Sequence, residues 1–363
     1  GLRRGSTSLA AAPQVVAGDL EPVTKAGRVP CGDWVEKLMR QQTMDIGFLV
    51  SSIRQRGFCR EAVLGKGAYG VVWLAQRRDA QGELYAVKNI AGTGNVARRE
   101  CDMSDQVRIL PHPCLVKLYG VQEFVDAELC VLVMEFVPGG DLLEAIGRAW
   151  ASPRDYTAPA ETLPWLGQIF LALEHLHLGM HVLLRDLKPD NVVLDRRRRA
   201  KLIDLGLGRI GTQSDGAFTL TASPPGTPGY CAPEVLQQQA YNEKADIYSF
   251  GVTAWMLLTG GLINRSPPRP PTGFDGRRIA SCFWDCELLH GCIDDPSAAA
   301  ALPLGPADAY AFVTSLTATH ASKRPDHEAI RAHAFFTGHL SLPLPERREG
   351  PSGVERWLTD LGF

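Results

Sequence analysis

The chain has 363 residues, of which 45% are hydrophobic, and its formal net charge is −2. This length and composition allow a substantial core, and the nearly neutral charge argues against nucleic acid or a bulk membrane surface as the main partner. The nine cysteines are scattered and odd in number, which favours a reducing compartment. No apolar run reaches the ~18 residues that span a bilayer, so we expect a cytoplasmic protein without a transmembrane segment.

The N-terminal stretch 1–30 is poor in acids, with Arg3, Arg4 and Ser6 but no acid before Asp19. Two interpretations stay open for it. It is either a disordered leader or the remnant of an organellar transit peptide, which would place the protein in a chloroplast.

Apolar residues recur at helical intervals through residues 31–56, for example Trp34, Leu38 and Ile53. This pattern predicts a helical extension that packs on the following domain. Simple core packing is the favoured explanation, with a regulatory role as the alternative.

A glycine pattern, Leu-Gly-Lys-Gly-Ala-Tyr-Gly-Val-Val, occupies residues 64–72 between two predicted strands. Glycine lets a backbone lie close over phosphates and point its amides at them. The pattern alone is weak evidence, because dinucleotide-binding folds use the same spacing. A short alternating strand with a single lysine, Lys88, is predicted next at 84–90.

The most informative stretch is Leu-Leu-Arg-Asp-Leu-Lys-Pro-Asp-Asn at 183–191, followed after a predicted hairpin by Asp204. A nucleotide triphosphate must be held by Mg²⁺ while a hydroxyl is aimed at its γ-phosphorus. Asp204 and Asn191 would supply oxygen ligands to the metal. Asp186 would accept the proton of the attacking hydroxyl, and Lys188 would offset the charge of the migrating group. The spacing therefore predicts phosphoryl transfer.

Together with further motifs, these stretches resemble the eukaryotic protein kinase family over roughly residues 57–337. The further motifs are a hinge-like strand at 131–142, Gly-Thr-x-x-Tyr at 226–230, Ala-Pro-Glu at 232–234, Asp-Ile-Tyr-Ser-Phe-Gly at 246–251 and Lys-Arg-Pro-Asp at 323–326. The catalytic stretch and the Gly-Thr-x-x-Tyr segment are similar to those of serine/threonine-directed members.

The resemblance implies an α+β, two-lobed fold. A small antiparallel-sheet lobe with one helix would occupy 57–137, and a larger, mainly helical lobe 138–337. A tail over 338–363 would follow, with a short helix at 354–363 after a proline-rich break. The resemblance also implies that Asp246 braces the catalytic loop and that Arg324 pairs with Glu234.

The resemblance further implies ATP and Mg²⁺ as cofactors and a protein as substrate. The catalytic residues it implies are Asp186, Lys188, Lys88 and Thr227. The nucleotide-binding residues it implies are Gly65, Lys66, Gly67, Ala68, Tyr69, Gly70, Val72, Ala86, Lys88, Glu100, Met134, Glu135, Phe136, Val137, Asp141, Asn191 and Asp204, of which Asn191 and Asp204 would hold the metal.

The acid that pairs with Lys88 has several candidates. A predicted helix at 95–110 carries the acids Glu100, Asp102 and Asp105. Counting back from His112 and Pro113 at the usual family spacing reaches Met103, which is not an acid. Glu100 lies almost one turn further toward the N-terminus, so an extra helical turn would restore the pairing, and we expect Glu100 to fill this role.

Two residues depart from the family pattern. Leu184 stands where the family has histidine, and Leu205 where it has phenylalanine. Two leucines could fill the same apolar volume without unpaired polar atoms, and neither change removes a catalytic atom. The Asp-Leu-Gly at 204–206 and the leader also give a weak likeness to thylakoid light-harvesting-complex kinases.

Other clusters have plainer explanations. Cys282, Cys286, His290 and Cys292 lack the paired knuckles of a structural zinc site. The arginine run 196–199 is better explained as a solvated turn than as a nucleic-acid patch. The stretch 264–276, rich in proline and arginine, is predicted to be an exposed insertion.

Regulation is suggested by the hydroxyls Thr219, Thr221 and Ser223, which precede Glu234. A phosphate there could pair with Arg185 and order the segment, which would require an upstream kinase or autophosphorylation. The hydroxyls could equally be ordinary loop residues.

We therefore expect an ATP-dependent serine/threonine protein kinase, and two alternatives stay open. A pseudokinase scaffold would bind partners without transfer, but the presence of Lys88, Asp186, Asn191 and Asp204 argues against it. A small-molecule kinase of related fold would generally lack the Ala-Pro-Glu segment.

Overall fold

The structure is a computed structural model. It describes residues 20–21, 60–67, 70–77, 84–91, 95–124, 129–152, 155–156, 158–206, 208–210, 226–227, 229–260 and 306–363. Several predictions fall outside these residues: the extension at 31–56, the insertion at 264–276, the cysteine cluster near 282–292, the hydroxyls Thr219, Thr221 and Ser223, and the loop residues Ala68 and Tyr69.

The chain divides into two compact units, which confirms the expected two-lobed α+β fold. The N-terminal unit comprises 1–108 and 117–136, and the C-terminal unit comprises 109–116 and 137–363. The division after Phe136 lies next to the boundary expected at 137. Residues 109–116 belong with the C-terminal unit, which no sequence motif indicated.

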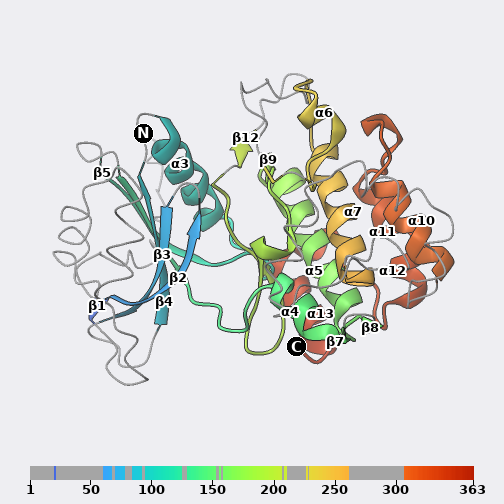
Figure 1. Ribbon diagram of the computed structural model, residues 1–363, viewed down its shortest axis with the longest axis horizontal. Helices are drawn as coiled ribbons and strands as arrows, with labels where there is room; N and C mark the ends of the chain where they lie inside the picture. The colour runs from blue at the N-terminus through green and yellow to red at the C-terminus, as the bar shows by residue number, and fades with distance from the viewer. Residues whose placement is uncertain are drawn as a thin grey trace, which may run out of the picture. The chain divides into compact units, whose positions relative to one another are not determined.

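The N-terminal unit is built on an antiparallel sheet, and the helix α3 (Asn95–Ile109) lies beside it (Figure 1). The strands are β1 (Leu20–Glu21), β2 (Arg60–Gly67), β3 (Gly70–Arg77), β4 (Leu84–Ala91), β5 (Leu118–Phe124) and β6 (Leu129–Glu135). Their order is β1-β3-β4-β6-β5, with β2 also paired to β3. Alternating β-branched and aromatic residues such as Val71, Trp73 and Val87 suit this pleated surface.

One short strand corrects the sequence analysis. Leu20 and Glu21, inside the stretch expected to be a disordered leader, pair with Arg77 and Gln76 of β3. The pairing of β2 with β3 begins at Ala75, so the end of β3 beyond it still carries open backbone groups. An unpaired strand edge is a template for another strand, and β1 uses it.

The C-terminal unit is mainly helical. Its longer helices are α4 (Leu142–Ala149), α5 (Thr162–Glu174), α7 (Lys244–Thr259), α10 (Pro306–Leu316) and α13 (Gly350–Asp360). Its shorter helices are α6 (Pro233–Leu236), α11 (His327–Arg331) and α12 (Ala334–His339), with the turns η2 (His175–Gly179), η3 (Pro189–Asn191), η5 (Ala321–Lys323) and η6 (Arg347–Glu349). Three antiparallel pairs complete it: β7 (Trp150–Ser152) with β8 (Asp155–Tyr156), β9 (Val182–Leu183) with β12 (Arg209–Ile210), and β10 (Val192–Leu194) with β11 (Ala200–Leu202).

The core of this unit is aromatic and centres on α5 and α7. Every residue of α7 from Ala245 to Thr259 is buried, as expected for a helix that is apolar nearly all round. Phe170 of α5 stacks on Phe250 of α7 with ring centroids 6.2 Å apart. These two buried helices form the core of the unit, and its loops are anchored to them.

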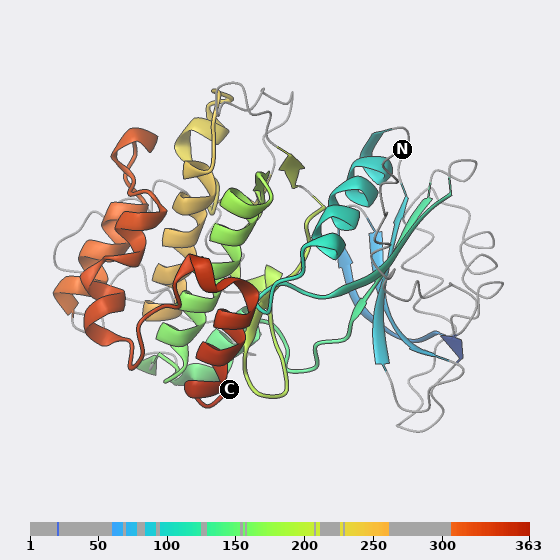
Figure 2. The ribbon, with the colours of Figure 1, turned by 180° about the vertical axis from the view of Figure 1, so that it is seen from behind.

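The C-terminal segment packs on this base. Figure 2 shows α13 in red beside the green α5. A Cβ at Gly167 of α5 would lie 3.1 Å from the ring of Trp357, so glycine permits the close approach. The helix begins at Gly350, which corrects the start predicted at 354. Pro351 lies in its first turn, where a missing N–H breaks no hydrogen bond.

Three cysteines are informative. Cys114 and Cys231 are buried thiols outside any disulfide, and burial raises the pKa of Cys114 to about 12. Cys130 of β6 is disulfide-bonded, a cross-link that the expectation of a reducing compartment does not include. Within the described part of the chain, no helix is long and apolar enough to cross a membrane.

Candidate active site

The stretch 183–191 runs from the end of β9 through a loop into η3 in the C-terminal unit. Its apolar residues anchor it in the core, because Leu184 and Leu187 are fully buried. Pro189 starts η3, where its fixed φ is already suited to a helical turn. The polar residues of the loop are thereby held between buried anchors.

Asp186, Lys188 and Thr227 form a closed triangle of hydrogen bonds. Lys188 Nζ donates to Asp186 Oδ2 at 2.9 Å and to Thr227 Oγ1 at 2.6 Å. The Thr227 hydroxyl donates in turn to Asp186 Oδ1 at 2.8 Å. The carboxylate is thus oriented through both of its oxygens. Thr227 reaches this site although it lies 39 positions after Lys188 and 41 positions after Asp186 in the chain.

Asn191 and Asp204 are brought next to this triangle. Asn191 Nδ2 donates to the Asp186 carbonyl at 2.8 Å and to Asp186 Oδ2 at 3.1 Å. Because the amide nitrogen makes these bonds, the amide oxygen is the atom that suits a metal. The Asn191 carbonyl accepts from Ile203 N at 2.9 Å, which places Asp204 beside the loop.

Asp204 itself has a positive φ of 61°, a left-handed conformation that aspartate tolerates better than most residues. Its Oδ1 accepts from Gly206 N at 3.2 Å. Across the described ranges, no group of three or more His, Cys, Asp or Glu side chains is arranged to hold a metal. Mg²⁺ commonly takes only one or two protein ligands and completes its shell with phosphate oxygens and water, so Asn191 and Asp204 fit this ion.

Asp246 of α7 braces the loop through its backbone, as the resemblance implied. Its two carboxylate oxygens accept from the backbone N–H groups of Leu184 and Arg185, both at 2.7 Å. Arg185 has a φ of 72°, and these hydrogen bonds offset the cost of that left-handed conformation. His177 Nε2 lies 2.9 Å from Asp246 Oδ2, a contact that the sequence analysis missed.

The segment that carries Thr227 ends in a second anchor. Arg324 donates to both oxygens of Glu234, at 2.6 and 2.8 Å, and Arg324 is only 3% exposed. Two parallel hydrogen bonds fix both distance and orientation. The pairing that the resemblance implied is therefore present.

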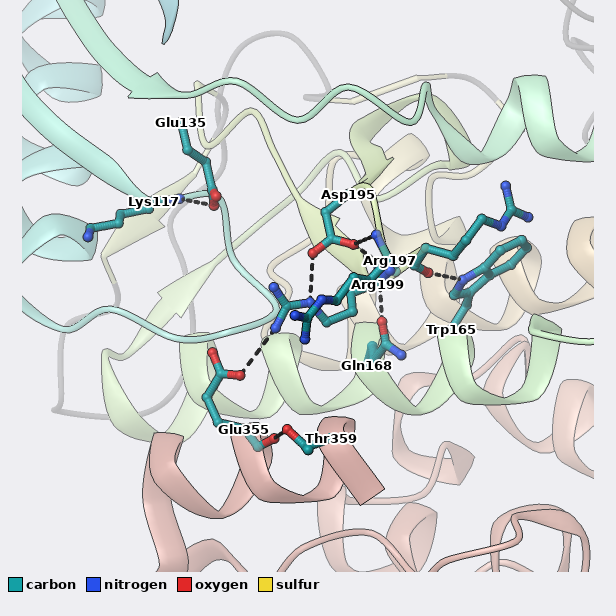
Figure 3. A network of polar contacts seen from close by, with 11 residues as sticks. Lys117, Glu135, Trp165, Gln168, Asp195, Arg197, Arg199, Glu355 and Thr359 are labelled. Atoms are coloured by element: carbon teal, nitrogen blue, oxygen red, sulfur yellow. Dashed lines mark hydrogen bonds and ion pairs between the residues drawn. The ribbon is translucent and has the colours of Figure 1, made fainter. Parts of the chain in front are cut away.

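The hairpin after Asn191 uses the arginine run for internal contacts (Figure 3). Asp195 Oδ2 accepts from Arg199 Nε at 2.6 Å, and Arg199 also pairs with Glu355 of α13 at 3.2 Å. The Arg198 guanidinium lies 4.9 Å from the Trp165 ring centre, and the indole N–H donates to the Arg198 carbonyl at 2.7 Å. These contacts tie the hairpin to α5 and α13.

In the N-terminal unit, the strand register gathers four predicted nucleotide-binding residues. Val72 is paired with Lys88, and Ala86 with Met134. Directly paired residues share a face, and so do residues two apart on one strand, so all four lie on one face of the sheet. At Gly70 an added Cβ would lie 2.0 Å from the Asn89 carbonyl, which explains why glycine is needed there.

The remaining predicted residues are placed as follows. Gly65, Lys66 and Gly67 lie in β2, and the side chain of Lys66 is outside the description. The Glu135 N–H donates to the Lys117 carbonyl at 2.9 Å, and Phe136 and Val137 follow. Asp141 Oδ1 accepts from Glu144 N at 2.8 Å at the start of α4.

The acid for Lys88 stays a prediction, since the Glu100 side chain is not described. Met103 and Val107 of α3 are buried, and Glu100 precedes them in the same helix. Asp102 is exposed, and Asp105 pairs with Arg108 at 2.8 Å. These positions make Asp102 and Asp105 poorer candidates, and Glu100 stays the predicted partner of Lys88.

Comparison with known proteins agrees with the family resemblance that the sequence motifs indicated. The chain matches the family described as the protein kinase domain over residues 58–336. It is 30% identical over 291 residues to "Serine/threonine-protein kinase nekl-2" of Caenorhabditis elegans, covering 77% of this chain and 74% of that protein.

Two further relatives are shorter matches. Over 201 residues the chain is 31% identical to "cAMP-dependent protein kinase type 3" of Saccharomyces cerevisiae, covering 54% of this chain and 47% of that protein. Over 229 residues it is 33% identical to "Calcium/calmodulin-dependent protein kinase type 1" of Caenorhabditis briggsae, covering 61% and 60%. The chain spans less than two thirds of these two relatives.

Proposed function

Because this chain belongs to the protein kinase family and its relatives are serine/threonine kinases, we propose that it is a competent ATP-dependent enzyme. It transfers the γ-phosphoryl group of ATP to serine or threonine hydroxyls of a protein substrate. The family match covers residues 58–336. The substrate class and the activating input of the whole protein are part of what we propose.

The observation that carries the proposal is the closed triangle of Asp186, Lys188 and Thr227. In this arrangement the Asp186 carboxylate is held in place before any substrate arrives, which lowers the cost of orienting it. It is the group that accepts the proton of the incoming hydroxyl. Lys188 lies beside it as the cation that offsets charge on the transferred group.

Asn191 and Asp204 are the residues that would hold Mg²⁺. The ion supplies neutralisation of the phosphate charge when it is bound. What this chain contributes is the placement of the two oxygen ligands. The Asn191 amide is locked by its hydrogen bonds to Asp186, and the Ile203–Asn191 backbone bond sets Asp204 next to it.

The nucleotide would be received in the N-terminal unit by the sheet face that carries Val72, Ala86, Lys88 and Met134. Aliphatic and thioether side chains suit an adenine ring, and Lys88 suits the α and β phosphates. Glu100 is the proposed partner that orients Lys88.

The two leucines that depart from the family pattern, Leu184 and Leu205, are part of the core, which bears on the pseudokinase alternative. Leu184 is fully buried and Leu205 is 8% exposed. Neither side chain brings a polar atom that would need a partner. Their burial supports the interpretation that they repack apolar volume and leave Asp186, Lys188 and Asn191 intact.

The proposed setting is the cytoplasm, with an upstream kinase or autophosphorylation as the activating input. The buried thiols of Cys114 and Cys231 form no disulfide, which supports a reducing compartment, whereas the disulfide at Cys130 opposes it.

The test is a transfer assay with the purified chain, Mg²⁺, radiolabelled ATP and a generic protein substrate. Asp186→Asn keeps the shape of the side chain but cannot accept the proton, so we expect a loss of about 10²- to 10⁴-fold in kcat. The matched control is Asp360→Asn, the same change at an exposed position of α13, which should act like the unmodified chain.

Phosphoamino-acid analysis of the labelled product tests the substrate class, and phosphoserine or phosphothreonine is expected. Label that does not exceed the Asp186→Asn level on any protein, including the chain itself, would contradict the proposal and favour a scaffold.

A further inference from the structure

A buried pair of histidines lies beneath the catalytic loop. His177 comes from η2 at the end of α5, and His327 opens α11, 150 positions further along the chain. His177 Nδ1 and His327 Nε2 are 2.9 Å apart, and both residues are 6% exposed. Their rings meet edge to face at 5.2 Å.

The pair continues into the brace of the loop. His177 Nε2 lies 2.9 Å from Asp246 Oδ2, and Asp246 accepts from the N–H groups of Leu184 and Arg185. A line of hydrogen bonds therefore runs from His327 through His177 and Asp246 to the backbone next to Asp186.

The proton positions follow from this geometry. A neutral imidazole has one N–H and one acceptor nitrogen. If His177 carries its hydrogen on Nε2, it donates to the Asp246 carboxylate, and its Nδ1 needs a donor, which His327 Nε2–H supplies. The opposite tautomer of His177 would turn a lone pair toward the carboxylate and repel it.

The surroundings keep His327 neutral, so that it has one hydrogen to give. Burial lowers its pKa from 6.5 to about 4. The other charged groups near it are Glu174 of α5, Arg347 of η6 and Lys244 of α7. Phe170 covers another side with ring centres 6.3 Å apart.

We propose that His327 is a positioning residue for phosphoryl transfer: its Nε2–H selects the Nε2–H tautomer of His177, which orients Asp246 and thereby the backbone of the catalytic loop. The kinetic part of this proposal rests on the proposed kinase activity. The tautomer of His177 does not depend on kinase activity, so it can be tested separately.

The first experiment measures the tautomer directly in the whole chain. Nitrogen chemical shifts of histidine-labelled protein at about pH 7 distinguish a protonated from an unprotonated ring nitrogen, and a His177→Gln variant assigns the signal. We expect His177 to carry its hydrogen on Nε2. A hydrogen on Nδ1 in the unmodified protein would overturn the proposal, whether or not the protein transfers phosphate.

The second experiment compares two replacements of His327. His327→Leu fills the space but removes the donor, whereas the amide nitrogen of His327→Gln reaches the position of Nε2 and restores it. We expect His327→Leu to mix the His177 tautomers and to lower kcat by about tenfold, because a buried acceptor is left unpaired. KM for ATP should be unchanged, and His327→Gln should recover most of kcat.

The control is His320→Leu, the same change at an exposed histidine of the same unit, which should leave kcat and tautomer unchanged. Thermal unfolding of each variant checks that it is folded. The proposal fails if His327→Leu keeps full kcat or an unmixed tautomer, or if His327→Gln is as impaired as His327→Leu. If the unmodified chain transfers no phosphate, the proposed function fails and the tautomer measurements still decide this inference.

Discussion

The ion pair of Arg324 and Glu234 is buried, so each residue depends on the other to offset its charge. Arg324 makes two bonds to Glu234 and also donates to the Lys244 and Ala318 carbonyls. Arg324→Met would leave a buried carboxylate without its partner. We expect a loss of about 3–5 kcal/mol in the free energy of unfolding, measured by urea titration.

The matched control for this prediction is Arg348→Met. Arg348 pairs with Glu346, but its side chain is 82% exposed, and exposed ion pairs contribute little. The double variant Arg324→Met with Glu234→Leu should be more stable than Arg324→Met alone, because it removes the orphaned charge. Equal losses for Arg324→Met and Arg348→Met would refute the prediction.

Spacing along the chain is most informative for the residues of the site that lie in one short stretch. Asp186, Lys188 and Asn191 lie within one loop, so their spacing alone indicates their joint chemistry. His177 and His327 meet only because α5 and α11 pack together, and a lone histidine in a helix carries no signal of its partner. The structure was needed to find them.

At the scale of elements, the C-terminal helix α13 is held by one aromatic anchor. Trp357 is 5% exposed and packs on Gly167. We expect Trp357→Ala to destabilise the protein by about 3–5 kcal/mol. Arg356→Ala, at the exposed neighbouring position, serves as the control and should have a small effect. Calorimetric unfolding of both variants measures the difference, and similar midpoints would rule out an anchoring role for the tryptophan.

Where the periodicity was regular, both the type of an element and its ends could be predicted to within about one residue. The helix expected at 95–110 is α3, Asn95–Ile109, and the strand expected at 84–90 is β4, Leu84–Ala91. The start of α13 was placed too late because proline was taken as a break, although it is compatible with a first turn. β1 was missed because two residues have no periodicity, and its pairing depends on the open end of β3.

At the scale of the whole molecule, acid sensitivity follows from groups that the C-terminal unit buries in their neutral or paired form. Burial lowers the pKa of His112 to about 3 and that of His327 to about 4. Burial alone would raise the pKa of Glu174, but the hydrogen bonds and charges of Arg331 and Arg347 lower it below its usual 4.5.

The sign of the effect is the same for all three groups. Unfolded histidine takes up a proton near pH 6.5, whereas folded His112 and His327 resist it down to about pH 3 and 4. The unfolded state therefore binds more protons in this window, and stability falls as the pH falls. Glu174 stabilises the fold above its unfolded pKa of 4.5, and this contribution is lost as the pH drops through its lower folded pKa.

We therefore expect the free energy of unfolding to decrease from about pH 6.5 downward, by up to ~1.4 kcal/mol per pH unit for each buried histidine. His112→Asn isolates one such contribution. The His112 Nδ1 accepts from Cys114 N at 3.2 Å, and an asparagine oxygen can take that bond while being unable to bind a proton. Urea titrations at steps between about pH 7 and pH 4 should give a shallower pH dependence for His112→Asn than for the unmodified chain. Parallel curves would show that His112 takes up its proton equally easily in both states, and would contradict a buried neutral histidine at this position.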